Sequence, residues 1–184
     1  MPDALHFTGE PEADALLAQE PLALLVGFAL DQQVTVQKAF SGPLELKRRL
    51  GSLDAGTIAS LPPDELEEIF RRKPALHRFP GAMARRVQEL CEVVERDYGG
   101  DAARVWTEAA DGADLHRRIA ALPGFGEMKV KSLSAVLAKR FGVAAAEPLV
   151  PGHPTLGDVD SPEALEAYQE AKRAHKAEWS AQRS

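Results

Sequence analysis

Apolar side chains recur at three- and four-residue steps along most of the chain, and this spacing constrains the fold more than any other feature. The clearest case is one stripe of apolar positions: Met83, Val87, Leu90, Cys91, Val94 and Tyr98. Such spacing is typical of an amphipathic helix, which the following Gly99-Gly100 would end. We find no alternating pattern that would indicate a strand. The sequence therefore predicts an all-α protein, with Cys91 in its core.

Further helices are expected around this one. Residues 21–40 predict an apolar helix that begins at Pro21 and stops at Ser41-Gly42-Pro43. Pro62-Pro63-Asp64 opens a short acidic helix, and residues 112–121 predict another. A further helix has Val130, Leu133, Leu137 and Phe141 on its apolar face. A final helix is expected from Ser161-Pro162-Glu163 to about residue 180.

The chain has room for one compact domain or two small lobes, since it has 184 residues. Residues 143–162 are rich in proline and glycine and predict a loop. We expect residues 21–142 to form a helical domain. Residues 1–20 and 143–184 would then form a second lobe from the two termini.

Composition excludes several classes of site. Cys91 is the only cysteine, so an intrachain disulfide, a thiolate zinc site and a four-cysteine iron–sulfur cluster are excluded. The apolar run over residues 21–30 is too short to cross a bilayer, and the acidic N-terminus lacks the basic start of a signal peptide. We expect a cytoplasmic protein with no membrane partner and no metal.

The net charge of −6 by itself argues against a nucleic-acid partner, but its distribution favours one. Residues 71–86 contain only basic charged residues. A second basic group is opposed within residues 115–142 only by Glu127, and it consists of Arg117, Arg118, Lys129, Lys131, Lys139 and Arg140. The two groups could line one face. The alternative is that they are ordinary solvated helix surfaces.

The most informative segment is Leu122-Pro123-Gly124-Phe125-Gly126, here called the glycine corner, which separates two predicted helices. Its glycines allow a tight turn and a close approach of the backbone to a ligand, and the next helix offers unpaired N–H groups. A DNA phosphate suits that geometry, and hairpin carbonyls could share a monovalent cation with it. The alternative interpretation is a plain corner between two helices.

Together with two other segments, the glycine corner resembles the helix-hairpin-helix (HhH-GPD) superfamily of base-excision DNA glycosylases. The second segment is Asp31-Gln32-Gln33-Val34-Thr35-Val36-Gln37-Lys38-Ala39, expected on the first long helix and similar to the family's glutamine-rich border of the flipped-base pocket. The third is the basic stretch through Arg85 and Arg86. The resemblance covers residues 21–142 and implies a two-lobed, all-α fold that binds double-stranded DNA containing a damaged base.

The sequence departs from the family at two catalytic positions. Many members carry a Schiff-base lysine two residues after the corner, where this chain has Met128. Lys129 is adjacent, but one helical step rotates it by about 100°, so we expect it to face solvent or phosphate. The aspartate of a Val-Asp-Thr-His-like segment is also missing. Hydrolysis of a glycosidic bond needs a nearby carboxylate, and the candidates are Glu147, Asp158, Asp160 and Asp31.

These patterns predict a monofunctional glycosylase without lyase activity, monomeric and without an iron–sulfur cluster. Asp31 and Asp160 are the catalytic candidates, although Asp160 could only cap a helix and Asp31 could only form a salt bridge. The base pocket would include Gln32, Gln33 and Met128. The DNA contacts would be Gly124, Phe125, Gly126, Lys129, Lys131, Arg117 and Arg118. The alternative function, motivated by the missing aspartate, is a non-catalytic DNA-binding or lesion-sensing module.

Overall fold

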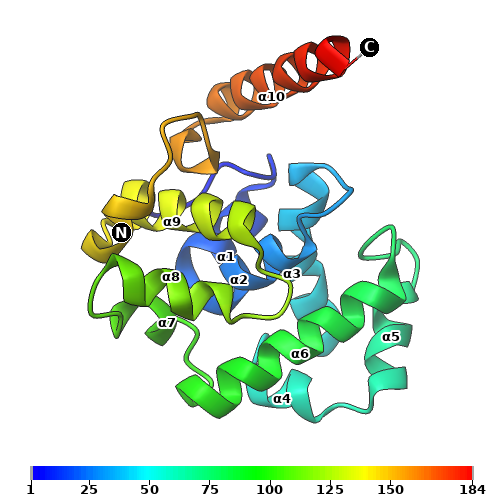
Figure 1. Cartoon of the computed structure of the whole chain (residues 1–184). Coiled ribbons are helices and arrows are strands. Elements are labelled where there is room, and N and C mark those ends of the chain that lie inside the picture. Colours follow the sequence, from blue (N-terminus) through cyan, green and yellow to red (C-terminus); the bar gives the residue numbers. More distant parts are fainter. Residues whose placement is uncertain (1, 184) are drawn as a thin grey trace.

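The computed structural model describes residues 2–183 as helices joined by short connections (Figure 1). In chain order the elements are α1 (Pro11–Gln19), α2 (Pro21–Leu30), α3 (Val36–Leu50), α4 (Ala55–Ser60), α5 (Pro63–Arg71), α6 (Pro80–Tyr98), α7 (Arg104–Thr107), α8 (Gly112–Ala120), α9 (Glu127–Phe141), the 3₁₀ helices η1 (Ala144–Leu149) and η2 (Leu156–Asp158), and α10 (Pro162–Arg183). No strand occurs in this described part of the chain, so the predicted all-α class is confirmed.

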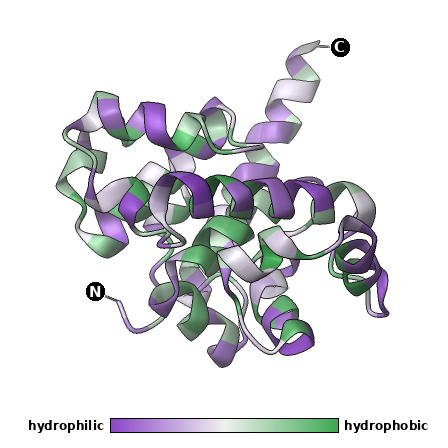
Figure 2. Ribbon diagram, turned by 90° about the horizontal axis from the view of Figure 1, so that it is seen from below, coloured by the Kyte–Doolittle hydropathy of each residue, from purple (hydrophilic) through white to green (hydrophobic). Residues whose placement is uncertain are grey.

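Helix α2 is the centre of the core, because every residue from Leu22 to Leu30 is buried. A helix that is apolar on all sides must be surrounded by protein. Helix α3 packs along it through Phe40, whose ring makes edge-to-face contacts with Phe7 and Phe28 at centroid distances of 5.0 Å each. Hydrophobic segments, green in Figure 2, lie mostly toward the middle of the molecule.

No single helix within residues 2–183 has the length and apolarity to cross a membrane. Only α1 and α2 counted together, across a bend of 114°, reach the required length and composition.

The prediction of a single helix over residues 21–40 is wrong. Helix α2 ends at Leu30, the backbone turns over residues 31–35, and α3 begins at Val36 after Thr35 caps it by accepting a hydrogen bond from the Lys38 N–H. Helix α3 then continues through Ser41-Gly42-Pro43. A proline inside a helix costs about 3 kcal/mol, but Pro43 is buried and packing on α2 outweighs that cost.

The other predicted helices are confirmed as α5, α6, α8, α9 and α10. Helix α6 ends at Tyr98 and is capped by Gly99, which adopts the left-handed φ of 60°. Cys91 is fully buried. The proline-rich loop after residue 142 contains the two 3₁₀ helices, which the sequence did not indicate. The division into two lobes stays a prediction. One apolar cluster takes side chains from both proposed parts, including Phe40 from residues 21–142 and Phe7 and Val159 from the terminal segments.

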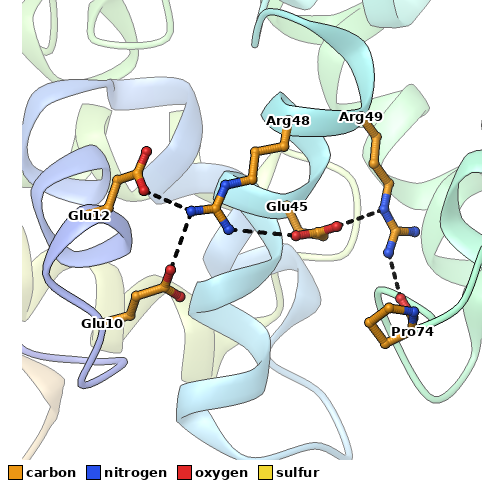
Figure 3. A network of polar contacts seen from close by, with 6 residues as sticks. All are labelled: Glu10, Glu12, Glu45, Arg48, Arg49 and Pro74. Atoms are coloured by element: carbon orange, nitrogen blue, oxygen red, sulfur yellow. Dashed lines mark hydrogen bonds and ion pairs between the residues drawn. The ribbon is translucent and has the colours of Figure 1, made fainter.

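The acidic N-terminal segment is neutralised by helix α3. Arg48 Nη2 lies 2.7 Å from a Glu12 carboxylate oxygen and 3.4 Å from one of Glu10 (Figure 3). Lys47, in the preceding position, pairs with Glu20 at 2.5 Å. Much of the negative charge near the N-terminus therefore lies inside ion pairs rather than on a free surface.

The neighbouring Arg49 holds the chain after α5. Its guanidinium donates hydrogen bonds to the Pro74 carbonyl at 2.5 Å and to Glu45 at 3.0 Å (Figure 3). It also donates to the carbonyls of Ile69 and Arg72 at 2.6 and 2.9 Å. Residues 72–79, here called the basic loop, are thus tied to α3.

Replacing Gly27 with alanine tests the packing of α2 on α3. A Cβ at Gly27 would lie 2.4 Å from Phe40 Cδ1, and Phe40 is held by two other rings. We expect Gly27→Ala to lower the free energy of unfolding by about 1–3 kcal/mol, although alanine is the better helix former. Urea denaturation measures this. Gly56→Ala, in α4, is the control, because its nearest neighbour is the flexible end of Glu95; equal effects of the two changes would contradict the packing argument.

Candidate functional site

The glycine corner joins α8 to α9 and is open to solvent at both glycines. Gly124 has a left-handed φ of 82°, and a Cβ there would lie 2.6 Å from Arg86 Cδ. Both the turn and the close approach of Arg86 therefore require glycine. The side chain of Phe125, one of the predicted DNA contacts, is only 4% exposed and belongs to the core. Its backbone N–H bonds to the Leu122 carbonyl at 3.1 Å, so only its carbonyl is left to a ligand.

The start of helix α9 is equipped to bind an anion. Gly126 is its N-cap and supplies no side-chain acceptor for the first-turn N–H groups. Gly126, Glu127 and Met128 are all exposed. A helix start with unpaired N–H groups and the positive end of the helix dipole attracts phosphate, as the sequence predicted.

Arg86, on α6, connects the corner to the glutamine-rich segment. Its side chain lies against Gly124, and its Nη1 donates a hydrogen bond to Gln32 Oε1 at 2.6 Å. The three segments that carried the family resemblance, far apart in the sequence, therefore meet at one guanidinium.

The glutamine-rich segment was expected on a helix, but only its residues 36–39 lie on one, at the start of α3. Residues 31–35 form a loop, here called the amide loop. Gln32 and Gln33 are exposed there, and Gln33 has the left-handed φ of 57° that non-glycine residues rarely adopt. Asp31 caps the end of α2 and is half-buried. Among the described residues no ion pair and no hydrogen-bond donor reaches its carboxylate, so the salt-bridge interpretation of Asp31 is not realised.

The buried side chain of His77 contacts the backbone on both sides of Asp31 at the start of the amide loop. Its Nε2 lies 3.0 Å from the Leu30 carbonyl and 3.1 Å from the Gln32 carbonyl, while Nδ1 accepts a hydrogen bond from the Phe79 N–H at 3.0 Å. These partners assign the ring proton to Nε2 and leave Nδ1 as an acceptor. Burial lowers the pKa of His77, although its bonds to Leu30 and Gln32 oppose this. Nothing in the sequence indicated that His77 would contact the carbonyls of the residues on both sides of Asp31.

Lys129 and Met128 point in directions opposite to those expected. Met128 is 84% exposed and does not line a pocket. Lys129 is half-buried, its Nζ donates to the Ala29 carbonyl at 3.3 Å, and the same atom lies 5.9 Å from the centroid of the Phe125 ring. Counting residues from the corner misled because the orientation of a side chain depends on how the whole helix is rotated against the core.

Asp31 and Lys129 influence each other's ionisation. Burial raises the pKa of Asp31, and the positive charges of Lys172 and Lys129 oppose that rise. Burial and the nearby Arg86 lower the pKa of Lys129, while Asp31 raises it. A carboxyl with a raised pKa and a lysine with a lowered pKa, close together in partly desolvated surroundings, are typical of a functional site.

The other carboxylates are less suited to chemistry here. Asp160 is exposed in the turn before Ser161, and Ser161 Oγ caps α10 by accepting from the Ala164 N–H. Asp158 is engaged by Lys139 and by the Thr155 N–H. Glu147 is exposed on η1. Among residues 2–183, no cluster of three His, Cys, Asp or Glu side chains could hold a metal ion.

The basic residues differ in how available they are. Arg117 and Arg118 both form ion pairs with Asp114. Asp114 lies one residue before the range 115–142, in which Glu127 is the only acid. Lys131 is exposed, and no ion pair involves it within the described chain. The same holds for several exposed side chains of the basic loop and the start of α6, which are Arg72, Lys73, Arg78 and Arg85. Next to them, Phe79 is 41% exposed, with the Arg78 guanidinium 5.3 Å from its ring centroid.

Removing His77 tests its hold on the amide loop through pH. Because the native pKa of His77 is lowered, its contribution to stability is present above the unfolded value of about 6.5 and is lost as the pH falls toward the native pKa. We expect the stability advantage of the wild type over His77→Gln to shrink by at most about 1.4 kcal/mol per pH unit below pH 6.5. Urea titrations between pH 5 and 8 measure it. A difference that is constant, or that grows with acid, would contradict the assignment.

Comparison with known proteins agrees with this geometry. No curated protein matched the chain, and no solved structure did. A family model, described as HhH-GPD superfamily base excision DNA repair protein, matches residues 26–140. This region is more than half of the chain and includes the amide loop, Arg86 and the glycine corner. The resemblance noted in the sequence is thereby confirmed, and the chain belongs to the HhH-GPD superfamily of base excision DNA repair proteins.

Proposed function

We propose that the chain is a monofunctional DNA glycosylase that extrudes a damaged base from double-stranded DNA and hydrolyses its N-glycosidic bond. The observation that carries this proposal is the half-buried carboxyl of Asp31, in a loop that Arg86 joins directly to the glycine corner. A group for chemistry and a group for phosphate binding thus lie on one connected piece of structure.

The DNA backbone would bind at the glycine corner. The N–H groups that begin α9 would donate hydrogen bonds to one phosphate, and hairpin carbonyls would share a monovalent cation with it. The exposed Lys131 and the cations of the basic loop would contact phosphates on either side. Bound in this way by one monomer, the duplex would present a nucleotide to the amide loop.

The chemistry would centre on Asp31. As the bond between C1′ and the base nitrogen breaks, positive charge develops on the sugar, and the ionised carboxylate would stabilise it and accept a proton from the attacking water. The oxygen of that water forms the new bond to C1′, and the base leaves with the bonding electron pair and takes up a proton. The exposed amides of Gln32 and Gln33 would bind the edge of the extruded base or its unpaired partner.

Lys129 supports a second candidate function, that of a lyase. Its pKa is lowered by burial and by the charge of Arg86, and this favours the neutral, nucleophilic amine. Against this, its Nζ donates to the Ala29 carbonyl and lies over the Phe125 ring, and both contacts favour the charged ammonium. We therefore assign Lys129 the role of a positive charge beside Asp31.

Base release from defined lesions tests the glycosylase. Duplexes with uracil, hypoxanthine, 8-oxoguanine or an alkylated purine are incubated with the protein and then cleaved with alkali. We expect Asp31→Asn to lower the single-turnover rate by about 10²–10⁴-fold without weakening DNA binding. Asp160→Asn is the matched control and should keep full activity. Loss with Asp160→Asn alone would make Asp160 the catalytic group, and tight binding by the wild type without any release would establish the lesion-sensing alternative.

Borohydride trapping separates hydrolysis from lyase chemistry. The wild type should form no covalent adduct with the DNA substrate, because water is the nucleophile. Lys129→Met should lower the rate of base release but leave detectable hydrolysis. An adduct that forms with the wild type and disappears with Lys129→Met, while Lys131→Met retains it, would assign Lys129 as a Schiff-base nucleophile.

A further inference from the structure

Helix α10 lies outside the region that the family model matches, yet its first half packs beside the amide loop. Leu165 is only 5% exposed and Tyr168 is half-buried against the core. Beyond residue 170 the described side chains are exposed, and the helix extends away from the body of the protein (Figure 1). The contact surface of α10 is therefore confined to its first two turns or so.

Two glutamines hold α10 in place. The side-chain amides of Gln37 and Gln169 exchange hydrogen bonds of 3.1 and 2.8 Å. Gln37 is in the first turn of α3, directly after the amide loop, whereas Gln169 is 132 residues further along the chain. This pairing uses a donor and an acceptor from each amide, and it sets the position of α10 along the start of α3.

Lys172 follows Gln169 by three residues, so both lie on one side of α10. The Lys172 Nζ lies 5.8 Å from the centroid of the Tyr168 ring. Tyr168 and Lys172 are thereby placed on the side of the helix that faces the amide loop.

The charged and titratable groups around Asp31 come from several elements. They are Lys129 on α9, Lys172 and Tyr168 on α10, and His77 in the basic loop. The charge of Arg86, on α6, acts on Lys129. The charge of Lys172 acts to lower the pKa of Asp31, and the charge of Asp31, after burial, raises the pKa of Tyr168. Asp31 is thus coupled to two residues of α10, which agrees with the hydrogen bonds between Gln37 and Gln169 that hold α10 beside the amide loop.

We propose that α10 is a working part of the site and that Lys172 is a positioning residue that keeps the Asp31 carboxyl ionised for the reaction. The proposal rests on the proposed function for its catalytic meaning. Burial favours the neutral carboxyl, which cannot stabilise a cationic sugar or accept a proton from water. Lys129 alone supplies one opposing charge, and Lys172 supplies the second from outside the family region.

A titration of the Asp31 carboxyl carbon by NMR tests this without any substrate, using the full chain and Asp31→Asn to assign the signal. We expect Lys172→Met to raise the pKa of Asp31 by about 0.5–1 unit, because one favourable charge is removed. Lys172→Arg should restore the wild-type value. Lys176→Met, one turn further along the exposed part of α10, is the matched control and should leave it unchanged. Since Lys172 is exposed, the shift should also diminish in 1 M salt.

The glutamine pair provides an independent variant. Gln169→Leu should release α10 and raise the pKa of Asp31 in the same direction, with circular dichroism showing that the fold is retained. The proposal would be overturned if the pKa of Asp31 stayed unchanged in both Lys172→Met and Gln169→Leu. It would also be overturned if Lys176→Met shifted that pKa as much as Lys172→Met does.

Base release then adds a second readout. The acidic limb of the pH–rate profile should move to higher pH in Lys172→Met by the same interval as the carboxyl titration, with KM unchanged. A shift in the titration without base release by the wild type would refute the proposed function alone. Base release with an unmoved titration and an unmoved acidic limb would refute the role of Lys172 alone.

Discussion

Helix α2 ends inside the protein, and its last carbonyl groups need hydrogen-bond donors where water is scarce. The Asp31 N–H bonds to the Phe28 carbonyl, Lys129 donates to Ala29, and the Leu30 carbonyl receives both the Gln32 N–H and His77. The two side-chain donors come from different parts of the chain. The need to satisfy one buried helix end therefore brings the amide loop, the basic loop and the start of α9 together.

The same helix end explains the electrostatics. The negative end of a helix dipole and partial burial both disfavour a carboxylate, and Asp31 is placed at that end. Positive side chains are favoured there, and Lys129 and Lys172 act on Asp31. Burial raises the pKa of this carboxyl, and the two lysines act against that rise. This condition suits acid–base chemistry and would be expensive to maintain for packing alone.

The sequence predicted the regular parts of the fold well, because the apolar stripes of α6 and α9 are local signals. It failed at residues 41–43, where packing of α3 on α2 overrides the preference of proline. The glycine corner and Asp31 were recognisable in the sequence. The roles of Arg86, His77 and Lys172 were not, because their partners lie far away along the chain. Likewise, the directions of Met128 and Lys129 depend on the rotation of α9 against the core, which no local residue count determines.

Gln33 carries a consequence of its own. A left-handed φ in a residue other than glycine costs on the order of 1 kcal/mol, and its exposed side chain is not buried in compensation. A glycine at this position would relax the backbone and strengthen the native state, but it would also delete one of the two amides. Stability of the native state and recognition of a ligand thus make opposite demands on residue 33. Selection for more stable variants would therefore favour glycine there and lower the activity.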